Sequence, residues 1–136
     1  MPKEAGYILR ISKESWVTQV FDTAVYYTAL PRSWKPGQVV LFLHKTNVGD
    51  AFIGYGLVGK THEVGELSEA EQLECERYGW HKAIEFKYVV KFERPLPVAE
   101  TFLRDSGTRG RYLHGLKLDS ERVSSVIDQA QCKQQA

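Results

Sequence analysis

Apolar residues alternate with polar ones, or run together, in several short segments, and each such segment predicts a β-strand. Alternation is clear over residues 6–12 (GYILRIS) and 81–97 (HKAIEFKYVVKFERPLP), where each strand has one apolar face. Residues 38–44 (QVVLFLH) contain a continuous apolar run, Val39 to Leu43, which is typical of a strand covered on both faces. Further strands are expected over residues 51–64 and 112–118, and a short strand or extended loop over 23–30.

Helical spacing appears between these strands. Residues 13–21 place apolar side chains on one helical face, with Ser12 as the expected N-cap. Residues 67–79 predict the clearest helix, because Ser68 and Glu71 form a capping box. Shorter helical segments are expected over 98–103 and over 119–130, the latter with Asp119 or Ser120 as cap and a frayed tail from about 130 to 136.

A tight turn at Pro36-Gly37 leads into the apolar strand, and Trp34 precedes it. We interpret Trp34 as a core residue that closes one end of the sheet; the alternative places it on the rim of a ligand site. Glycines recur in the following strand, at Gly54 and Gly56 among others. They predict sharp coiling of that strand, or a close approach by another group.

These elements predict one α+β domain over residues 1–136, with five to six mostly antiparallel strands and three to four short helices in a small, strongly curved sheet or barrel. Hydrophobic residues make up 43% of the chain and charged residues 26%, which is typical of a soluble globular protein. The formal charge of +1 argues against bulk electrostatic binding to nucleic acid, but it allows a local basic patch.

Several classes of protein and site are not expected. No apolar segment is long enough for a membrane span or signal peptide, so we expect a cytoplasmic protein. Neither Cys75 nor Cys132 has a Cys or His at metal-ligand spacing, and no cofactor motif is present.

Three stretches stand in a characteristic order: residues 7–16 (YILRISKESW), 35–44 (KPGQVVLFLH) and 53–64 (IGYGLVGKTHEV). This order resembles the PUA-like superfamily, and most of all its EVE and YTH branch. The resemblance implies a pseudo-β-barrel with helices at its ends. It also implies a binding module without catalysis, which holds RNA or a modified base in an aromatic pocket.

The resemblance also implies where ligands bind. The pocket of the EVE and YTH branch corresponds here to Ser12, Lys13, Tyr26, Tyr27, Trp80 and His81. The chain departs from the family at Tyr26-Tyr27, where a Trp-Gly-type step is expected. A late basic strand would hold Arg109, Arg111, Tyr112 and His114.

The residues themselves give independent support for nucleic-acid binding. Aromatic rings stack on bases and arginines contact phosphates, and this chain interleaves both types. The loop at residues 104–111 (RDSGTRGR) carries Arg104, Arg109 and Arg111 around Gly107 and Gly110. Each feature has a structural alternative: a solvated connection for this loop, a core position for Trp80, and a core position for either Tyr26 or Tyr27.

We therefore predict a nucleic-acid-binding module that recognises RNA or a modified base through an aromatic cleft with a basic rim. One alternative is a protein–protein adaptor or subunit. Another is a small nucleoside-directed hydrolase, as some PUA-like relatives of the ASCH type are. The hydrolase is disfavoured because the glycine-led Lys/Glu/Arg pattern expected of those relatives is not evident, and because no G-x-S-x-G or H-E-x-x-H motif is present.

Overall fold

The computed structural model describes residues 6–108 and 110–135, with only the backbone of Arg111. The strands are β1 (Gly6–Arg10), β2 (Val25–Thr28), β3 (Val39–Thr46), β4 (Gly49–Glu63), β5 (Lys82–Pro97) and β6 (Lys117–Leu118). The helices are α1 (Glu14–Thr23), α2 (Glu69–Tyr78) and α3 (Ser120–Gln135), with short 3₁₀ turns η1 (Val64–Glu66), η2 (Val98–Glu100), η3 (Phe102–Asp105) and η4 (Gly110–Leu113).

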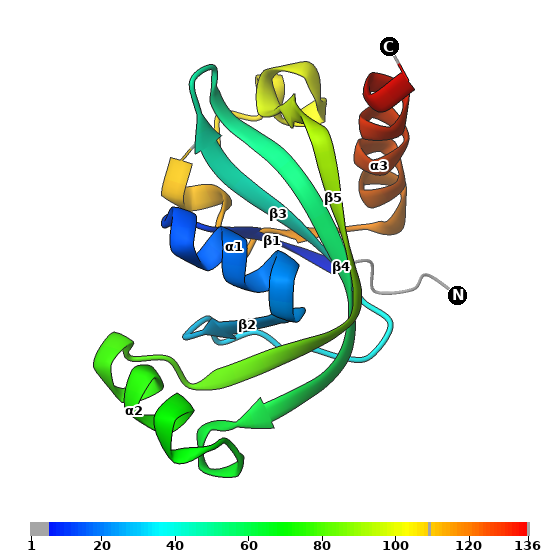
Figure 1. Ribbon diagram of the computed structural model, residues 1–136. Coiled ribbons are helices and arrows are strands. Elements are labelled where there is room, and N and C mark those ends of the chain that lie inside the picture. Colours follow the sequence, from blue (N-terminus) through cyan, green and yellow to red (C-terminus); the bar gives the residue numbers. More distant parts are fainter. Residues whose placement is uncertain (1–5, 109, 136) are drawn as a thin grey trace.

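The six strands form one sheet in the order β2-β5-β4-β3-β1-β6. β1 pairs with β3 in parallel, and the other pairs are antiparallel. β4 and β5 are long and strongly curved, and Figure 1 shows them running past both α1 and α2. Register shifts interrupt their ladder at three places, which bends both strands. The predicted α+β class and mostly antiparallel sheet are confirmed, but the sheet is curved without being closed.

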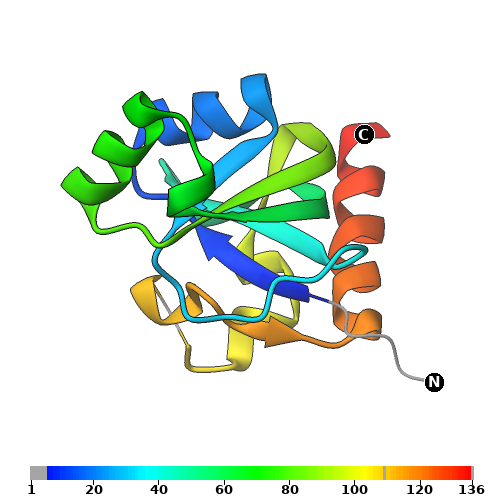
Figure 2. The ribbon, with the colours of Figure 1, turned by 90° about the horizontal axis from the view of Figure 1, so that it is seen from below.

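The central strand β3 separates two hydrophobic cores. Val40 and Phe42 face the core beneath α1, whereas Leu41 and Leu43 face the core beneath α3, and all four are fully buried. Figures 1 and 2 show α1 and α3 packed over different parts of the sheet. The uninterrupted apolar pattern of residues 38–44 therefore predicted correctly a strand covered on both faces.

Trp34 belongs to the core beneath α1. Its side chain is 6% exposed, and its ring meets the ring of Tyr7 edge-on with centroids 5.1 Å apart. Gly37 turns the chain into β3 with a φ of 90°, a conformation that favours glycine. The fold therefore supports the interpretation of Trp34 as a core residue.

Gly54 and Gly56 in β4 allow aromatic rings to approach the backbone closely, as their pattern predicted. A Cβ atom at Gly56 would lie 2.7 Å from Cδ1 of Phe86 and 3.1 Å from Cζ of Phe42. At Gly54 it would lie 2.7 Å from Cζ of Phe21. All these rings are held in the core beneath α1, so they have little room to move.

Substituting Gly56→Ala is therefore expected to lower the free energy of unfolding by about 1–3 kcal/mol, because a methyl group overpacks this core. Urea denaturation measures the change. Gly65→Ala is the matched control, since a Cβ there meets no atom within 4 Å. Equal stability of the two variants would contradict the packing described for β4.

Two element boundaries differ from the sequence expectation. Helix α1 has Lys13 rather than Ser12 at its N-cap, without a capping hydrogen bond from the side chain. Only Lys117–Leu118 of the predicted strand at 112–118 is extended. Residues 110–113 form the 3₁₀ turn η4, and Gly115, with a φ of 82°, lies between this turn and β6.

The C-terminal helix also extends further than predicted. The sequence predicted fraying from about residue 130, but α3 continues to Gln135. The Gln134 amide nitrogen donates to the Arg94 carbonyl at 2.8 Å, and its oxygen accepts the Arg94 N–H at 2.7 Å. These two bonds anchor the last turn to β5. At the other end, Asp119 caps the helix by accepting the N–H of Arg122.

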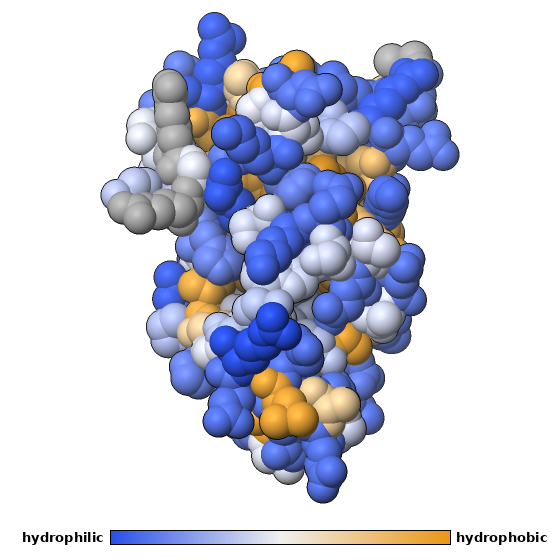
Figure 3. All heavy atoms as spheres, turned by 60° about the vertical axis from the view of Figure 1, so that its left-hand side comes forward, coloured by the Kyte–Doolittle hydropathy of each residue, from blue (hydrophilic) through white to orange (hydrophobic). Residues whose placement is uncertain are grey.

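Among the described residues, the exposed large hydrophobic side chains are distributed over several elements. They are Val48 at the β3–β4 turn, Leu73 and Tyr78 on α2, Tyr88 on β5 and Tyr112 on η4. The face drawn in Figure 3 is mostly hydrophilic, with its apolar side chains in separate patches. No helix in the described part of the chain is long and apolar enough to cross a membrane.

Candidate functional site

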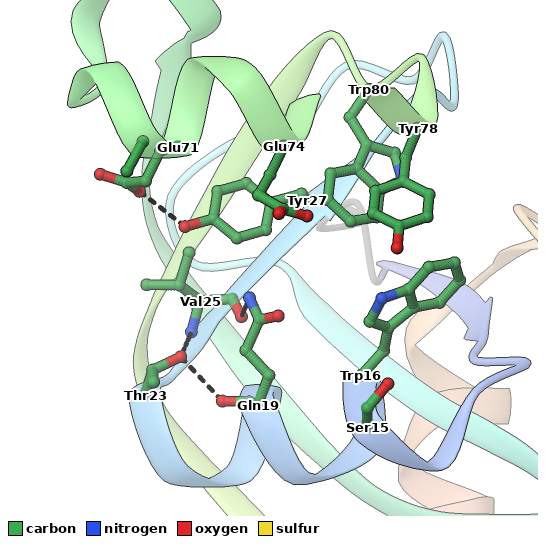
Figure 4. Close-up of a pocket in the computed structure, with 11 residues that line it drawn as sticks. Ser15, Trp16, Gln19, Thr23, Val25, Tyr27, Glu71, Glu74, Tyr78 and Trp80 are labelled. Carbon is green, nitrogen blue, oxygen red and sulfur yellow. Dashed lines mark hydrogen bonds between the residues drawn. The ribbon is translucent and has the colours of Figure 1, made fainter. Parts of the chain in front are cut away.

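Four aromatic side chains gather where α1, β2, α2 and the start of β5 meet (Figure 4). They are Trp16 from α1, Tyr27 from β2, Tyr78 from the end of α2, and Trp80 just before β5. We call these four residues the aromatic wall. All four line two neighbouring cavities, so the wall is common to both.

The rings of the wall are arranged around Trp80. Tyr78 stacks on Trp80 with centroids 4.7 Å apart, and Tyr27 lies nearly parallel to Trp80 at 5.4 Å. Trp16 meets both Tyr78 and Trp80 edge-on, at 5.5 and 5.4 Å. Such offset and edge-on contacts stabilise an aromatic cluster beyond the burial of its area. The wall is thus a preformed aromatic surface.

Local sequence features position the two halves of this wall. In β2, strand alternation points Tyr26 into the core, where its side chain is 7% exposed, and points Tyr27 the other way. Burial raises the pKa of the Tyr26 hydroxyl to about 12. Gly79 ends α2 in the left-handed conformation, with a φ of 72°. This reversal lets the Trp80 N–H donate to the Cys75 carbonyl and brings the Trp80 ring beside Tyr78.

The first cavity has a volume of about 420 Å³, and we call it the polar cavity. Besides the wall, it is lined by groups that can form hydrogen bonds: Arg10, Ser12, Thr28 and His114. The Arg10 guanidinium is held by Asp50, with Nη2 and Nε at 3.1 and 3.2 Å from Oδ1. Aromatic rings and fixed hydrogen-bonding groups therefore meet in one hollow.

His114 has a defined protonation state in this cavity. Its Nδ1 accepts the backbone N–H of Arg10 at 2.9 Å. Burial lowers the pKa of the imidazole, and the positive charges of Arg10 and Arg32 lower it further. The ring is therefore neutral at neutral pH, with its proton on Nε2. This Nε2–H group can donate a hydrogen bond to a ligand.

The second cavity lies between α1 and α2 and has a volume of about 680 Å³; we call it the interhelical cavity. Tyr27 crosses it, and its hydroxyl donates to Glu71 Oε2 at 2.6 Å. Burial and the Glu71 carboxylate raise the pKa of the Tyr27 hydroxyl. Hydrogen bonds from Tyr27 and Ser68 lower the pKa of Glu71, so this carboxylate stays ionised.

This hydrogen bond predicts a pH dependence of stability. The pKa of the Glu71 carboxyl is lowered in the folded state, so the ionised carboxylate adds to the free energy of unfolding. This stabilisation is complete above the ordinary pKa of 4.5, and it is lost as the pH falls through the pKa of the folded state. Glu71→Gln is therefore expected to be less stable than the wild type at neutral pH and to approach it in acid. Thermal unfolding across this pH range measures the difference. A stability difference between Glu71→Gln and the wild type that stays the same across this pH range would contradict the proposed contribution of the hydrogen bond.

The structure brings most of the predicted pocket residues together. Ser12, Tyr26, Tyr27 and Trp80 all line the polar cavity, and His114 joins them from the predicted basic strand. Lys13 lies at the edge of the wall, with its ammonium 4.8 Å from the Trp16 ring centre. His81 is exposed and lines neither cavity; its backbone N–H donates to Thr28.

The remaining predicted basic residues lie elsewhere. Arg104 lines a separate hollow of about 290 Å³ beside the β3–β4 turn, and Tyr112 is 68% exposed on η4. Arg109 and the side chain of Arg111, both predicted to bind nucleic acid, lie outside the described part of the chain. Arg104 lies on η3 and Tyr112 on η4, rather than on a strand.

Sequence reasoning missed three residues of the site. The helical spacing of residues 13–21 predicts a core position for Trp16. Strand alternation over residues 6–12 places Arg10 with Ile8, opposite the strongly apolar face, and predicts no role in a site. The sequence indicates Tyr78 only as a member of the aromatic stretch at residues 78–81 (YGWH), which includes Trp80. Trp16 and Tyr78 become site residues because their rings meet across α1 and α2, a long-range contact without a local pattern. Arg10 joins them in the lining of the polar cavity from the end of β1. Within the described residues, no group of three or more His, Cys, Asp or Glu side chains could hold a metal ion.

Comparisons with known proteins place the fold. No protein-family model matches the sequence, and no curated protein matches it. Among solved structures, the chain is similar to the ASCH protein from Zymomonas mobilis, with a TM-score of 0.65 and 10% sequence identity. The match covers 93% of this chain and 96% of that one. The ASCH domain belongs to the PUA-like superfamily. The particular resemblance of this chain to the EVE and YTH branch stays a prediction. The chain has the PUA-like fold, and its sheet is not closed.

Proposed function

We propose that the protein binds single-stranded RNA and takes one unstacked base into the polar cavity. The observation that carries this proposal is the meeting of the aromatic wall with Arg10 and neutral His114 in one hollow. Aromatic rings offer stacking surfaces to any base, and fixed donors read the edge of that base. The PUA-like fold, in which RNA-binding domains are common, supports the same class of ligand.

The polar groups suit a base edge. His114 offers an Nε2 proton, while the Ser12 and Thr28 hydroxyls both donate and accept hydrogen bonds. The guanidinium of Arg10 is fixed by Asp50, so a ligand that contacts it does not have to order a flexible side chain. Such a site can discriminate between bases, and also between a modified base and an unmodified one. The resemblance to the EVE and YTH branch supports a modified base as the ligand.

Basic residues beside the cavity suit the phosphate backbone. Arg10 and Arg32 are both close enough to His114 to lower its pKa, so positive charge gathers on this side of the wall. Lys13 adds an ammonium at the wall's edge. Neutralising phosphates releases counterions, so binding to a strand should weaken as salt rises.

Tryptophan fluorescence titration with short single-stranded RNA and DNA, at two salt concentrations, tests the proposal. The chain has three tryptophans, and two of them lie in the wall. We expect saturable quenching by RNA, with an affinity that falls by at least about tenfold between 50 and 200 mM salt if several phosphates are contacted. A panel of modified nucleosides then identifies the group that the cavity reads.

His114→Ala provides the matched variant for this titration. It removes the Nε2 donor and leaves the wall intact, so we expect weaker binding by about 1–3 kcal/mol, the usual value for a specific base contact. His81→Ala is its control, because His81 is exposed and lines neither cavity. If neither RNA nor any nucleoside quenches the wild type, the proposal is wrong.

A further inference from the structure

We propose that the interhelical cavity is a second site, which binds a small organic cation such as an alkylammonium or N-methylated amine. This site is distinct from the polar cavity, although the two share the aromatic wall. The proposal rests on the chemistry of the lining residues, on the charge of the two flanking helices, and on a cation that already lies against the wall.

The lining of the interhelical cavity suits a cation. Its aromatic residues are the four of the wall, whose ring faces carry partial negative charge. Its charged residues are Glu71 and Glu74, and the lining includes no lysine or arginine. Figure 4 shows the Glu74 side chain descending from α2 toward Tyr27 and Trp80. Aromatic rings combined with carboxylates are the chemistry that recognises ammonium groups.

The flanking helices strengthen this preference. α1 and α2 together carry six acidic residues and a single basic one, Arg77. Glu71 holds its negative charge because Tyr27 and Ser68 donate hydrogen bonds to it. A phosphate in this cavity would meet like charge, so the nucleic-acid backbone is expected to stay on the other side of the wall. An ammonium group would instead be attracted from solution.

The protein already holds one cation against the wall. The Lys13 ammonium lies 4.8 Å from the Trp16 ring centre and 5.1 Å from that of Tyr78. Both distances are within the range of a cation–π interaction. The rings of the wall therefore attract positive charge in their folded arrangement, and the cavity beside them has room for a ligand of several carbon atoms.

Choline and its uncharged carbon isostere, dimethylbutanol, test this inference, because the two share a shape and differ in charge. Binding is followed through the indole N–H signals of the 136-residue protein in two-dimensional NMR. We expect choline to shift the Trp16 and Trp80 signals saturably and to bind at least about tenfold more tightly than the isostere. The Trp34 signal should stay in place, because Trp34 is buried outside both cavities.

Glu74→Gln removes one carboxylate from the cavity without changing its size, so choline affinity should fall by at least about threefold. Glu76→Gln changes the same charge on the same helix outside the cavity and should have a smaller effect. Equal binding of choline and dimethylbutanol, or no saturable shift with choline, tetramethylammonium or putrescine, would overturn the inference. The RNA affinity of Glu74→Gln should be unchanged or higher than that of the wild type. Because choline binding and RNA binding are measured separately, a failure of the cation proposal is distinguishable from a failure of the RNA proposal.

Discussion

Replacing Phe42 with alanine is expected to lower the free energy of unfolding by about 3–5 kcal/mol, the usual cost of removing a buried phenyl ring. Phe42 is fully buried in β3 and meets the rings of Phe21 and Phe86 edge-on, with centroids 5.6 and 5.3 Å away. It thereby joins α1, β3 and β5. Deleting the ring leaves a cavity that these elements cannot close, because each is fixed by its own ladder or helix.

Urea denaturation followed by circular dichroism measures this loss. Tyr88→Ala is the matched control, since Tyr88 is an aromatic residue of the same sheet that is 47% exposed. We expect the control to stay within about 1 kcal/mol of the wild type. Should Phe42→Ala unfold at the same urea concentration as Tyr88→Ala, the core beneath α1 would not be packed as described.

Replacing Trp80 with alanine is expected to weaken RNA binding by about 5- to 150-fold, equivalent to about 1–3 kcal/mol for one stacked base. Trp80 stacks with both Tyr27 and Tyr78, so its loss removes the ring that links the other residues of the wall. Trp80→Phe keeps an aromatic face at the same position, and it should retain part of the affinity.

The titration of these variants uses Tyr88→Ala as the control, because it removes an exposed aromatic ring that lines neither cavity. Thermal unfolding of each variant establishes that it is folded. If Trp80→Ala is folded and binds RNA as the wild type does, the wall is not the binding surface. If Trp80→Ala fails to fold, the comparison of Trp80→Phe with Tyr88→Ala decides the same question.

Much of the fold follows from local patterns in the sequence. The Ser68–Glu71 capping box and the glycine at Gly79 mark both ends of α2, as predicted, because each signal lies within one helical turn. The uninterrupted apolar run of β3 likewise predicts a strand covered on both faces. Such elements depend on neighbouring residues alone, so one sequence is enough to find them.

The sheet order and the open edge could not be predicted in this way. β1 lies between β3 and β6, and its parallel pairing with β3 joins residues about thirty positions apart. The short strand β6 depends on Gly115, whose backbone turn is set by contacts with Ile8 and Arg32. No local pattern in residues 112–118 carries that information.

The candidate site was predictable only in part. Strand alternation indicated that either Tyr26 or Tyr27 points away from the core, but the pairing of β2 with β5 decides which. Trp16 has the spacing of a core residue, and it becomes part of the wall because α2 returns beside α1. Local sequence therefore identified the aromatic residues, whereas tertiary contacts assigned them to a surface.

The indole N–H signals of the three tryptophans test the central proposal most directly, because they report on the site and on the core in one spectrum. The measurement is a two-dimensional NMR titration of the 136-residue protein with a short single-stranded RNA. Binding at the polar cavity predicts that the Trp16 and Trp80 signals shift in proportion to occupancy, while the Trp34 signal does not move. Saturable RNA binding that leaves the Trp16 and Trp80 signals unmoved would contradict the proposed site, and an unchanged spectrum with no binding would contradict the proposed function.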